Sequence, residues 1–267
     1  MSKFSKSIFS VLFSLVLVVA LLGVTINSKT IFAEPNKAPR VVKVGVYDNP
    51  PKIYKDSDGQ IKGFWADLLT YISLQENWNI DYVFGTFDEG LSRLENQSID
   101  IMVDVGYSPT RAEIFAFTNE TAFINWAGVY SSNNLNIESF QDLDGRRIAV
   151  MKNDIHYIGP LGMKSMMDSF GYNANYIEES SYAECLKAVE DGKADIGVVN
   201  RLFGAHSEDK YNIKRTSLVY NPIELKFAIA KDTENTEYYI EAIDHNLKLL
   251  KADPDSIYYQ SIIENLE

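Results

Sequence analysis

Residues 99–118, IDIMVDVGYSPTRAEIFAFT, contain the local pattern that decides the fold class. The apolar start predicts a buried strand, and the turn at 106–109 ends it, because Pro109 cannot continue a strand ladder. Arg111 follows at once, at the carboxyl end of the strand, where open α/β sheets place their ligands. Its planar guanidinium fits a carboxylate or a phosphate. The alternative is a solvated arginine that starts a surface helix.

This strand belongs to a unit that occurs twice in the chain. TFDEGLSRLENQSIDIMV at 86–103 aligns without gaps with SYAECLKAVEDGKADIGV at 181–198, an offset of 181 − 86 = 95 residues. Each copy begins with a capping-box pattern, continues as an amphipathic helix and ends in a strand. Strands that alternate with helices predict an α/β protein with mostly parallel sheets, and the repeat predicts two lobes.

The lobes are not separated by a linker rich in Pro, Gly or Ser. We expect lobe 1 to comprise 41–128 plus 230–267, and lobe 2 to comprise 129–229. The chain should therefore pass between the lobes through strands, near 129–132 and near 222–227. These two crossings are the expected hinge.

The N-terminal segment at 1–33 is typical of export. Lys3 and Lys6 form a positive start, an apolar run follows at 8–26, and IFA at 31–33 is a passable cleavage site. The run is long enough that an uncleaved membrane anchor is the alternative to a signal peptide. Either way we expect the rest of the chain to be periplasmic or extracytoplasmic, with no second apolar span.

The rest of the chain is strongly acidic. The segment at 1–33 holds three of the 25 basic residues and none of the 37 acidic residues. The rest of the chain therefore has a net charge of 22 − 37 = −15. Such a charge repels nucleic acid and anionic membranes, so we expect no nucleic-acid partner. Cys185 is the only cysteine, which excludes an internal disulfide.

The sequence contains no recognisable catalytic or metal-binding pattern. The three histidines, at 156, 206 and 245, lie far apart, and neither a glycine-rich phosphate loop nor a nucleophile elbow is present. We therefore expect no metal, no cofactor and no enzymatic activity. Asp104 is the one acid placed to matter, since it follows the buried strand beside Arg111. A ligand contact and a turn or capping aspartate are equally open for it.

Two tryptophans are further candidates for ligand contacts. Trp65 lies on the apolar stripe of a helix expected from residue 64, where packing in the core is the alternative. Trp126 lies within an apolar strand expected at 123–130.

Residues 41–265 resemble the type II periplasmic solute-binding proteins of the polar amino-acid family, solute-binding protein family 3. The segments that carry the resemblance occur in the family's order: VKVGVY at 42–47, GFWADLL at 63–69, YSPTRAEIFAFT at 107–118, DLDGRRIAVMKND at 142–154 and DGKADIGVVN at 191–200. The resemblance implies two α/β lobes, joined by two hinge strands, that close on a ligand. Segments such as NPPKIY at 49–54 look closer to sensor modules of this fold, which precede histidine kinases or diguanylate cyclases.

The resemblance also implies roles for individual residues. Arg111 takes the place of the arginine that clamps a ligand's α-carboxylate, and Phe87 falls where the family puts an aromatic ring against the ligand. Asn153 and Asp154 fall at a helix start whose backbone N–H groups help to bind the same carboxylate.

Other positions depart from the family pattern. Asn200 replaces the aspartate that holds the ligand's α-amino group, and a neutral amide cannot balance a buried ammonium. Asn49 stands where many members have an aromatic residue, Asp104 where many have a serine, and Ile155 where a hydroxyl is usual. Two hypotheses follow: Asp104 holds the ligand's amine in place of the missing aspartate, or Asp104 pairs with Arg111.

These observations predict an extracytoplasmic solute-binding protein that captures a small carboxylated, amino-acid-like ligand between two closing lobes. Its partner is either the permease of an ABC-type transporter or a membrane sensor, and we expect a monomer. The alternative is an enzyme, since a few members of this fold resemble dehydratases that act on small carboxylic acids. In that case Asp104 is the acid or base.

Overall fold

The computed structural model describes residues 38–267, and Pro39–Glu267 form one compact unit. The predicted targeting segment at 1–33 lies outside the described residues. Between residues 38 and 267, no helix combines the length and the apolar character that a membrane span requires.

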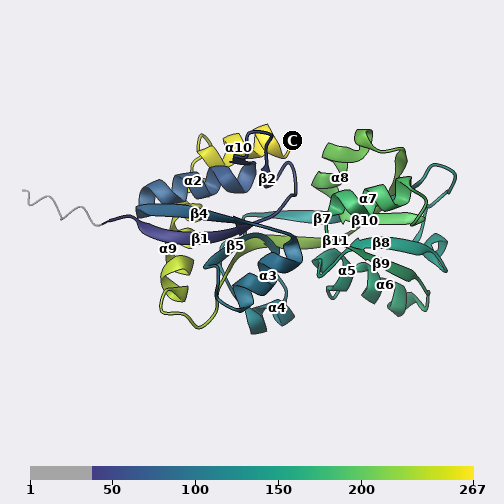
Figure 1. The fold of residues 1–267 in the computed structure, drawn as a ribbon, viewed down its shortest axis with the longest axis horizontal. Coiled ribbons are helices and arrows are strands. Elements are labelled where there is room, and N and C mark those ends of the chain that lie inside the picture. Colours follow the sequence, from purple (N-terminus) through teal and green to yellow (C-terminus); the bar gives the residue numbers. More distant parts are fainter. Residues whose placement is uncertain (1–37) are drawn as a thin grey trace, which may run out of the picture. The chain divides into compact units, whose positions relative to one another are not determined.

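Most strands of this unit join in one continuous sheet (Figure 1). Its order is β4 (Trp78–Phe84), β1 (Arg40–Val46), β5 (Ile101–Gly106), β11 (Ile213–Ile229), β7 (Phe123–Ser132), β10 (Ile196–Asn200), β8 (Arg147–Met151) and β9 (Asn175–Glu179), with β6 (Ala116–Phe117) beside β11. A separate pair consists of β2 (Tyr54–Lys55) and β3 (Ile61–Lys62).

The two ends of the sheet repeat the same parallel arrangement, as the internal repeat predicts. β1 pairs in parallel with β4 and β5, and β8 pairs in parallel with β9 and β10. The first lobe is built on β4, β1 and β5, and the second lobe on β10, β8 and β9. The fold is therefore α/β with two lobes.

The repeated helices are α3 (Phe87–Glu95) and α7 (Tyr182–Glu190). Thr86 and Glu89 form the predicted capping box of α3. The second predicted box is only half formed: Ser181 caps α7, but the Glu184 carboxylate accepts from Ser180 N–H instead of closing on the capping residue. Both helices nevertheless begin where the sequence pattern places them.

Strands β7 and β11 run antiparallel and connect the lobes (Figure 1). β7 pairs with β11 from Phe123 to Ser132 and gains β10 as a second neighbour over residues 127–131, which overlap the predicted crossing at 129–132. In β11 the register shifts between Tyr220 and Ile223, around Asn221, whose φ is +52°. This irregularity lies at the edge of the predicted crossing at 222–227.

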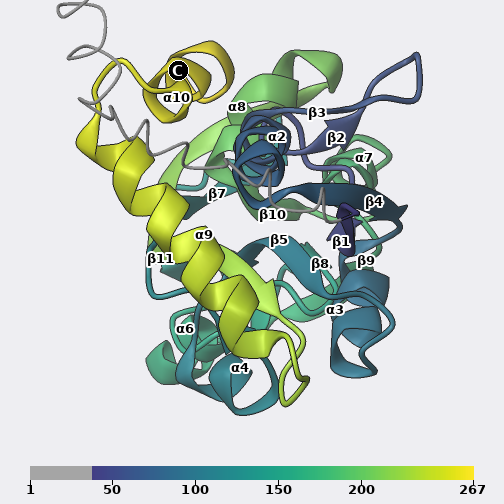
Figure 2. The ribbon, with the colours of Figure 1, turned by 90° about the vertical axis from the view of Figure 1, so that its left-hand side faces the viewer.

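The remaining helices cover the sheet or the ends of its strands. They are α2 (Phe64–Glu76), α4 (Pro109–Ile114), α5 (Ile155–Ile158), α6 (Met163–Phe170), α8 (Arg201–Ser207), α9 (Thr236–Ala252) and α10 (Ile257–Asn265), with short 3-10 helices η1 (Phe140–Leu143) and η2 (Glu208–Lys210). Figure 2 shows α9 as the long helix that runs diagonally beside the sheet, with α10 at its end.

Trp65 belongs to the core of the first lobe. Its side chain has no exposed surface, and its ring centroid lies 4.9 Å from that of Phe227 and 5.9 Å from that of Phe123. The structure therefore places Trp65 in the core, and this residue does not line the cavity described below. The apolar stripe of α2 packs against the sheet, and that packing takes up the indole.

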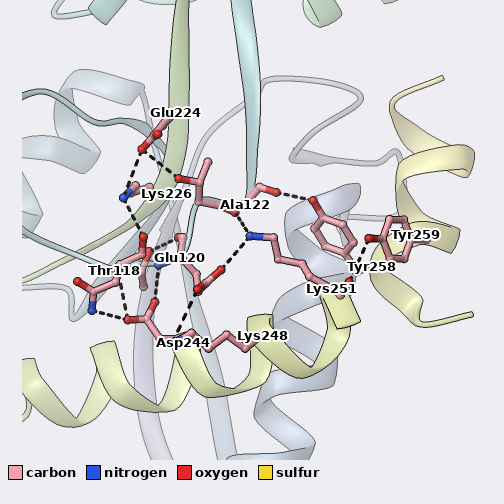
Figure 3. A network of polar contacts seen from close by, with 12 residues as sticks. Thr118, Glu120, Ala122, Glu224, Lys226, Asp244, Lys248, Lys251, Tyr258 and Tyr259 are labelled. Atoms are coloured by element: carbon pink, nitrogen blue, oxygen red, sulfur yellow. Dashed lines mark hydrogen bonds and ion pairs between the residues drawn. The ribbon is translucent and has the colours of Figure 1, made fainter. Parts of the chain in front are cut away.

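A polar network fastens the loop between β6 and β7 to α9 (Figure 3). The buried carboxylate of Asp244 accepts hydrogen bonds from the backbone and side chain of Asn119, at 3.0 and 2.7 Å, and from Glu120 N–H at 2.8 Å. Lys251, about two turns after Asp244 along α9, donates to the Glu120 carboxylate and to Thr121 O, both at 2.9 Å. The start of β7 is thereby held by the C-terminal part of the chain.

Candidate functional site

Asp104 lies near the carboxyl end of β5 with its carboxylate buried. Its Oδ2 accepts hydrogen bonds from Tyr47 OH at 2.7 Å and from Asn49 Nδ2 at 2.6 Å. Its Oδ1 accepts from Lys52 Nζ at 2.7 Å, and the Lys52 side chain is only 2% exposed. β1 and β5 are neighbours, so the loop after β1 meets the end of β5, and the first lobe alone supplies all three donors.

The Lys52–Asp104 ion pair answers a question that the sequence left open. The three hydrogen-bond donors to Asp104 belong to Tyr47, Asn49 and Lys52, so the predicted alternative in which Asp104 pairs with Arg111 is wrong. Burial lowers the pKa of Lys52, and Asp104 acts in the opposite direction. Burial and the neighbouring Asp104 raise the pKa of Tyr47 well above its ordinary value, so its hydroxyl keeps the proton that it donates.

Arg111 is buried, which contradicts the alternative of a solvated surface arginine. Ser108 caps α4 and accepts from Arg111 N–H, which places the side chain beside the end of β5. The guanidinium donates through Nη1 to Gly106 O at 2.8 Å and through Nη2 to Asn153 O at 2.6 Å. It also lies 5.6 Å from the centre of the Phe87 ring. The contact with Asn153 crosses from the first lobe to the second.

Asn200 joins the two lobes as a neutral partner. Its Oδ1 accepts from Phe203 N–H and from Asn125 Nδ2, both at 3.0 Å, which makes it the cap of α8. Its Nδ2 donates to Asn49 Oδ1 at 2.8 Å. The oxygen of this amide and one N–H of its nitrogen are therefore already paired within the protein.

Asp154 begins α5 in the second lobe but makes no side-chain capping bond. Its side chain is buried, and its Oδ2 has no hydrogen-bond partner. The neighbouring residues reach across to the first lobe, where Lys152 Nζ lies 2.7 Å from an Asp88 carboxylate oxygen and the Asn153 amide donates to the same carboxylate. Asp154 is thus held at the boundary between the lobes.

These residues surround a cavity of about 10 Å³, room for about one water molecule. Its walls come from both lobes: Tyr47, Lys52, Phe87, Asp104, Gly106, Arg111, Asp154, Ile155, His156, Tyr182, Asn200 and Leu225. Any larger ligand requires the lobes to separate. The structure therefore shows the cleft in a closed state, with direct contacts between lobes.

Seven of the nine predicted ligand-binding residues meet here. Five line the cavity: Phe87, Asp104, Arg111, Asp154 and Asn200. Asn49 and Asn153 contact members of this group. Trp65 and Trp126 are not among the residues that line the cavity.

Four further residues with polar side chains line the cavity and were not predicted from the sequence: Lys52, Tyr47, Tyr182 and His156. Tyr47 directly follows the first strand and Lys52 lies in the loop after it, at the strand's carboxyl end, and this position was a usable signal. His156 gave no such signal because its surroundings depend on distant segments: its Nδ1 lies 3.2 Å from Asn221 Nδ2.

His156 makes stability dependent on pH. Burial is the main cause that lowers its pKa below the ordinary 6.5; Lys52 and Arg111 add to this effect, while Asp154 and Asp104 oppose it. A lowered pKa in the folded state means that unfolded chains take up the proton first, so stability is present above pH 6.5 and is lost as the pH falls below it.

We therefore expect the free energy of unfolding to fall by up to about 1.4 kcal/mol more in the parent than in His156→Gln between pH 7.5 and 5.5. Urea denaturation at both pH values measures this difference. His245→Gln is the matched control, since His245 is exposed. Equal pH dependence in the parent and in His156→Gln would contradict the prediction.

Within residues 38–267, no group of three or more His, Cys, Asp or Glu side chains is placed to hold a metal ion. The site is instead a set of paired and unpaired charges between two lobes. Its chemistry suits binding of a small polar molecule by closure.

Comparisons with known proteins agree with this architecture. Among solved structures, an ancestral arginine-binding protein bound to arginine is 18% identical, with a TM-score of 0.74 over 85% of this chain and 98% of that chain. A histidine kinase sensor domain with similarity to periplasmic binding proteins is 19% identical, with a TM-score of 0.73 over 85% and 96%. An ancestral amino acid-binding protein, a precursor of cyclohexadienyl dehydratase, is 21% identical, with a TM-score of 0.70 over 85% and 95%.

At these identities the similarity shows the fold. A search of curated proteins gave no match. The sequence profile of one family, however, matches residues 42–255, which is most of the chain. The protein therefore belongs to the bacterial extracellular solute-binding proteins, family 3.

Proposed function

We propose that this protein captures a small carboxylated, amino-acid-like ligand between its lobes, outside the cytoplasm, for ABC-type uptake or for sensing. The proposal rests on the hydrogen-bond partners of Arg111. Its guanidinium is buried in the cleft, yet the acceptors of its two hydrogen bonds are neutral backbone carbonyls. No carboxylate within residues 38–267 lies within ion-pair distance of it.

A buried cation without an anionic partner is costly, and a ligand carboxylate removes that cost. The planar guanidinium binds a carboxylate through two parallel hydrogen bonds. The Nη2–Asn153 contact occupies one donor in the closed state, so a ligand carboxylate would replace a bond between the lobes. Ligand binding and lobe contact are thereby coupled at one side chain.

Delivery to a permease and signalling to a membrane sensor share this binding chemistry and differ only in the partner. Both kinds of protein occur among the structural neighbours, which include the substrate-binding protein of an amino acid ABC transporter and a histidine kinase sensor domain. The dehydratase alternative needs a free acid or base. Asp104, the residue assigned to that role, already accepts from three donors, one of them a lysine, which argues against it.

Calorimetric titration of the purified protein with the twenty standard L-amino acids, and with small carboxylic acids that lack an amine, tests this proposal. We expect saturable binding of at least one compound. The closed cleft must first open to admit it, so small-angle X-ray scattering at saturation should show a smaller radius of gyration than that of the open, ligand-free protein. The absence of binding in both sets would contradict the proposed function. Unchanged dimensions at saturation would contradict closure.

A further inference from the structure

The charged side chains around the cavity are not all paired. Four of the lining residues carry an acid or a strong base: Lys52, Asp104, Arg111 and Asp154. Lys52 and Asp104 form an ion pair with a 2.7 Å separation. Arg111 and Asp154 remain, and neither takes part in an ion pair within residues 38–267.

Asp104 cannot serve a ligand's ammonium group without losing an existing partner. Each of its oxygens accepts at least one hydrogen bond of 2.7 Å or less, and Lys52 already supplies the positive charge. Displacing Lys52 would leave a second buried ammonium unpaired, which costs several kcal/mol. The earlier hypothesis that Asp104 holds the ligand's amine is therefore disfavoured by the structure.

Asn200 is excluded on similar grounds. It is neutral, and its amide oxygen and nitrogen are used by α8, Asn125 and Asn49. The family resemblance places the partner of the ligand's amine at Asn200. In this structure the Asn200 side chain instead forms a hydrogen bond with Asn49 of the other lobe.

Asp154 is the remaining carboxylate. It is 3% exposed, it lines the cavity, and its Oδ2 lacks any hydrogen-bond partner. Burial raises the pKa of the Tyr182 phenol, which lines the same cavity, well above its ordinary value, and the Asp154 charge is the next cause, so this hydroxyl stays protonated. Buried polar atoms are nearly always paired, so an unpaired carboxylate oxygen facing a cleft indicates a missing donor.

We propose that the Asp154 carboxylate holds the ammonium group of the ligand while Arg111 holds its carboxylate, so that the ligand is a zwitterion. This inference rests on the proposed function and names the ligand class. Each charge then has one partner: Lys52 with Asp104, Arg111 with the ligand carboxylate, and Asp154 with the ligand ammonium. The zwitterion adds no net charge to a buried site, so the free-energy cost of its desolvation is lower than for an ion with a net charge.

The two anchors come from different lobes. Arg111 belongs to α4 of the first lobe, and Asp154 begins α5 of the second. A zwitterion between them links the lobes through its own two charges, so only a molecule with both groups completes the closed state.

The test compares an amino acid with its hydroxy analogue. The probes are the L-amino acid that binds the parent most tightly in the calorimetric screen, and the 2-hydroxy acid with the same side chain. Asp154→Asn keeps the shape of the side chain and removes its charge. Asp168→Asn, at an exposed position of α6 in the same lobe, is the matched control.

We expect Asp154→Asn to weaken binding of the amino acid about 30-fold or more, the usual consequence of removing one partner of a buried charge pair. Binding of the hydroxy acid should change less than about threefold, and Asp168→Asn should change neither. The unfolding midpoint of Asp154→Asn should equal or exceed that of the parent, since the replaced oxygen has no partner to lose. Asp154→Ser is the second variant and should show the same discrimination.

Equal losses for both probes, or unchanged affinity for the amino acid, would overturn the inference. Binding of amine-free carboxylic acids without binding of any amino acid would also overturn it while leaving the proposed function intact. Failure of both classes of compound to bind the parent would overturn the proposed function, and the inference with it.

Discussion

Replacing Arg111 with alanine should weaken ligand binding by roughly 2–5 kcal/mol, or from about 30-fold to several thousand-fold in Kd. The guanidinium is buried between the lobes, and its Nη2 makes the 2.6 Å contact with Asn153 O that crosses the cleft. Alanine would leave the ligand carboxylate without its cation in a site from which water is excluded.

Arg111→Lys should recover little of this loss. An ammonium supplies the charge but cannot reproduce two parallel hydrogen bonds, and the shorter reach breaks the contact with Asn153. Calorimetry with the tightest-binding compound measures both variants. Arg146→Ala, on a half-buried position of the second lobe outside the cavity, is the control. An Arg111→Ala variant that binds as tightly as the parent would reduce this arginine to a structural role.

Lys52→Met should lower the free energy of unfolding by about 3–5 kcal/mol, the typical result of removing one partner from a buried ion pair. The methionine fills a similar volume, so the cost comes from Asp104, which is left as a buried charge with only Tyr47 and Asn49 as donors. Lys62→Met, at an exposed position, should change stability by less than about 0.5 kcal/mol.

The double variant Lys52→Met/Asp104→Asn makes it possible to measure the interaction energy between Lys52 and Asp104 apart from the contacts that each residue makes with other residues. Asn tolerates the left-handed backbone at residue 104, where φ is +61°, and it carries no charge. We expect the double variant to be clearly more stable than Lys52→Met alone. Urea denaturation of the parent, both single variants and the double variant gives the coupling energy, and a value near zero would show that the two residues act independently.

The fold could be predicted from the sequence because its determinants are local and repeated. The gapless repeat at 86–103 and 181–198 marks two equivalent helix–strand units, and the turn after β5 marks the ligand edge of the sheet. The irregularity within β11 could not be predicted from the sequence. The register shift at Asn221 depends on how two long strands pair across the lobes, and no local pattern encodes it.

The site was predictable only where a residue's position along a strand determines its role. Asp104 lies in the last part of β5, which continues to Gly106 beyond the predicted end of the strand, and Arg111 follows that strand, so their place in the cleft followed from topology. The ion pair of Asp104 with Lys52 joins residues that are far apart in sequence and meet only because β1 and β5 are adjacent. For Trp65 the sequence was not sufficient. An apolar stripe on a helix shows that a side chain is buried, but it does not show which neighbouring residues pack against that side chain.

The position of β11 in the sheet sets an order for the assembly of the nascent chain. Residues 225–229 of β11 pair with β5 at the centre of the sheet, and Ser261 of α10 donates to Asp67 of α2 at 2.6 Å. The first lobe therefore contains both the earliest and the latest described parts of the chain, whereas β8, β9 and β10 follow one another within one continuous stretch. During synthesis the second lobe can pack as soon as it emerges, while β1, β4 and β5 must wait for the C-terminal residues before their sheet and its covering helices are complete.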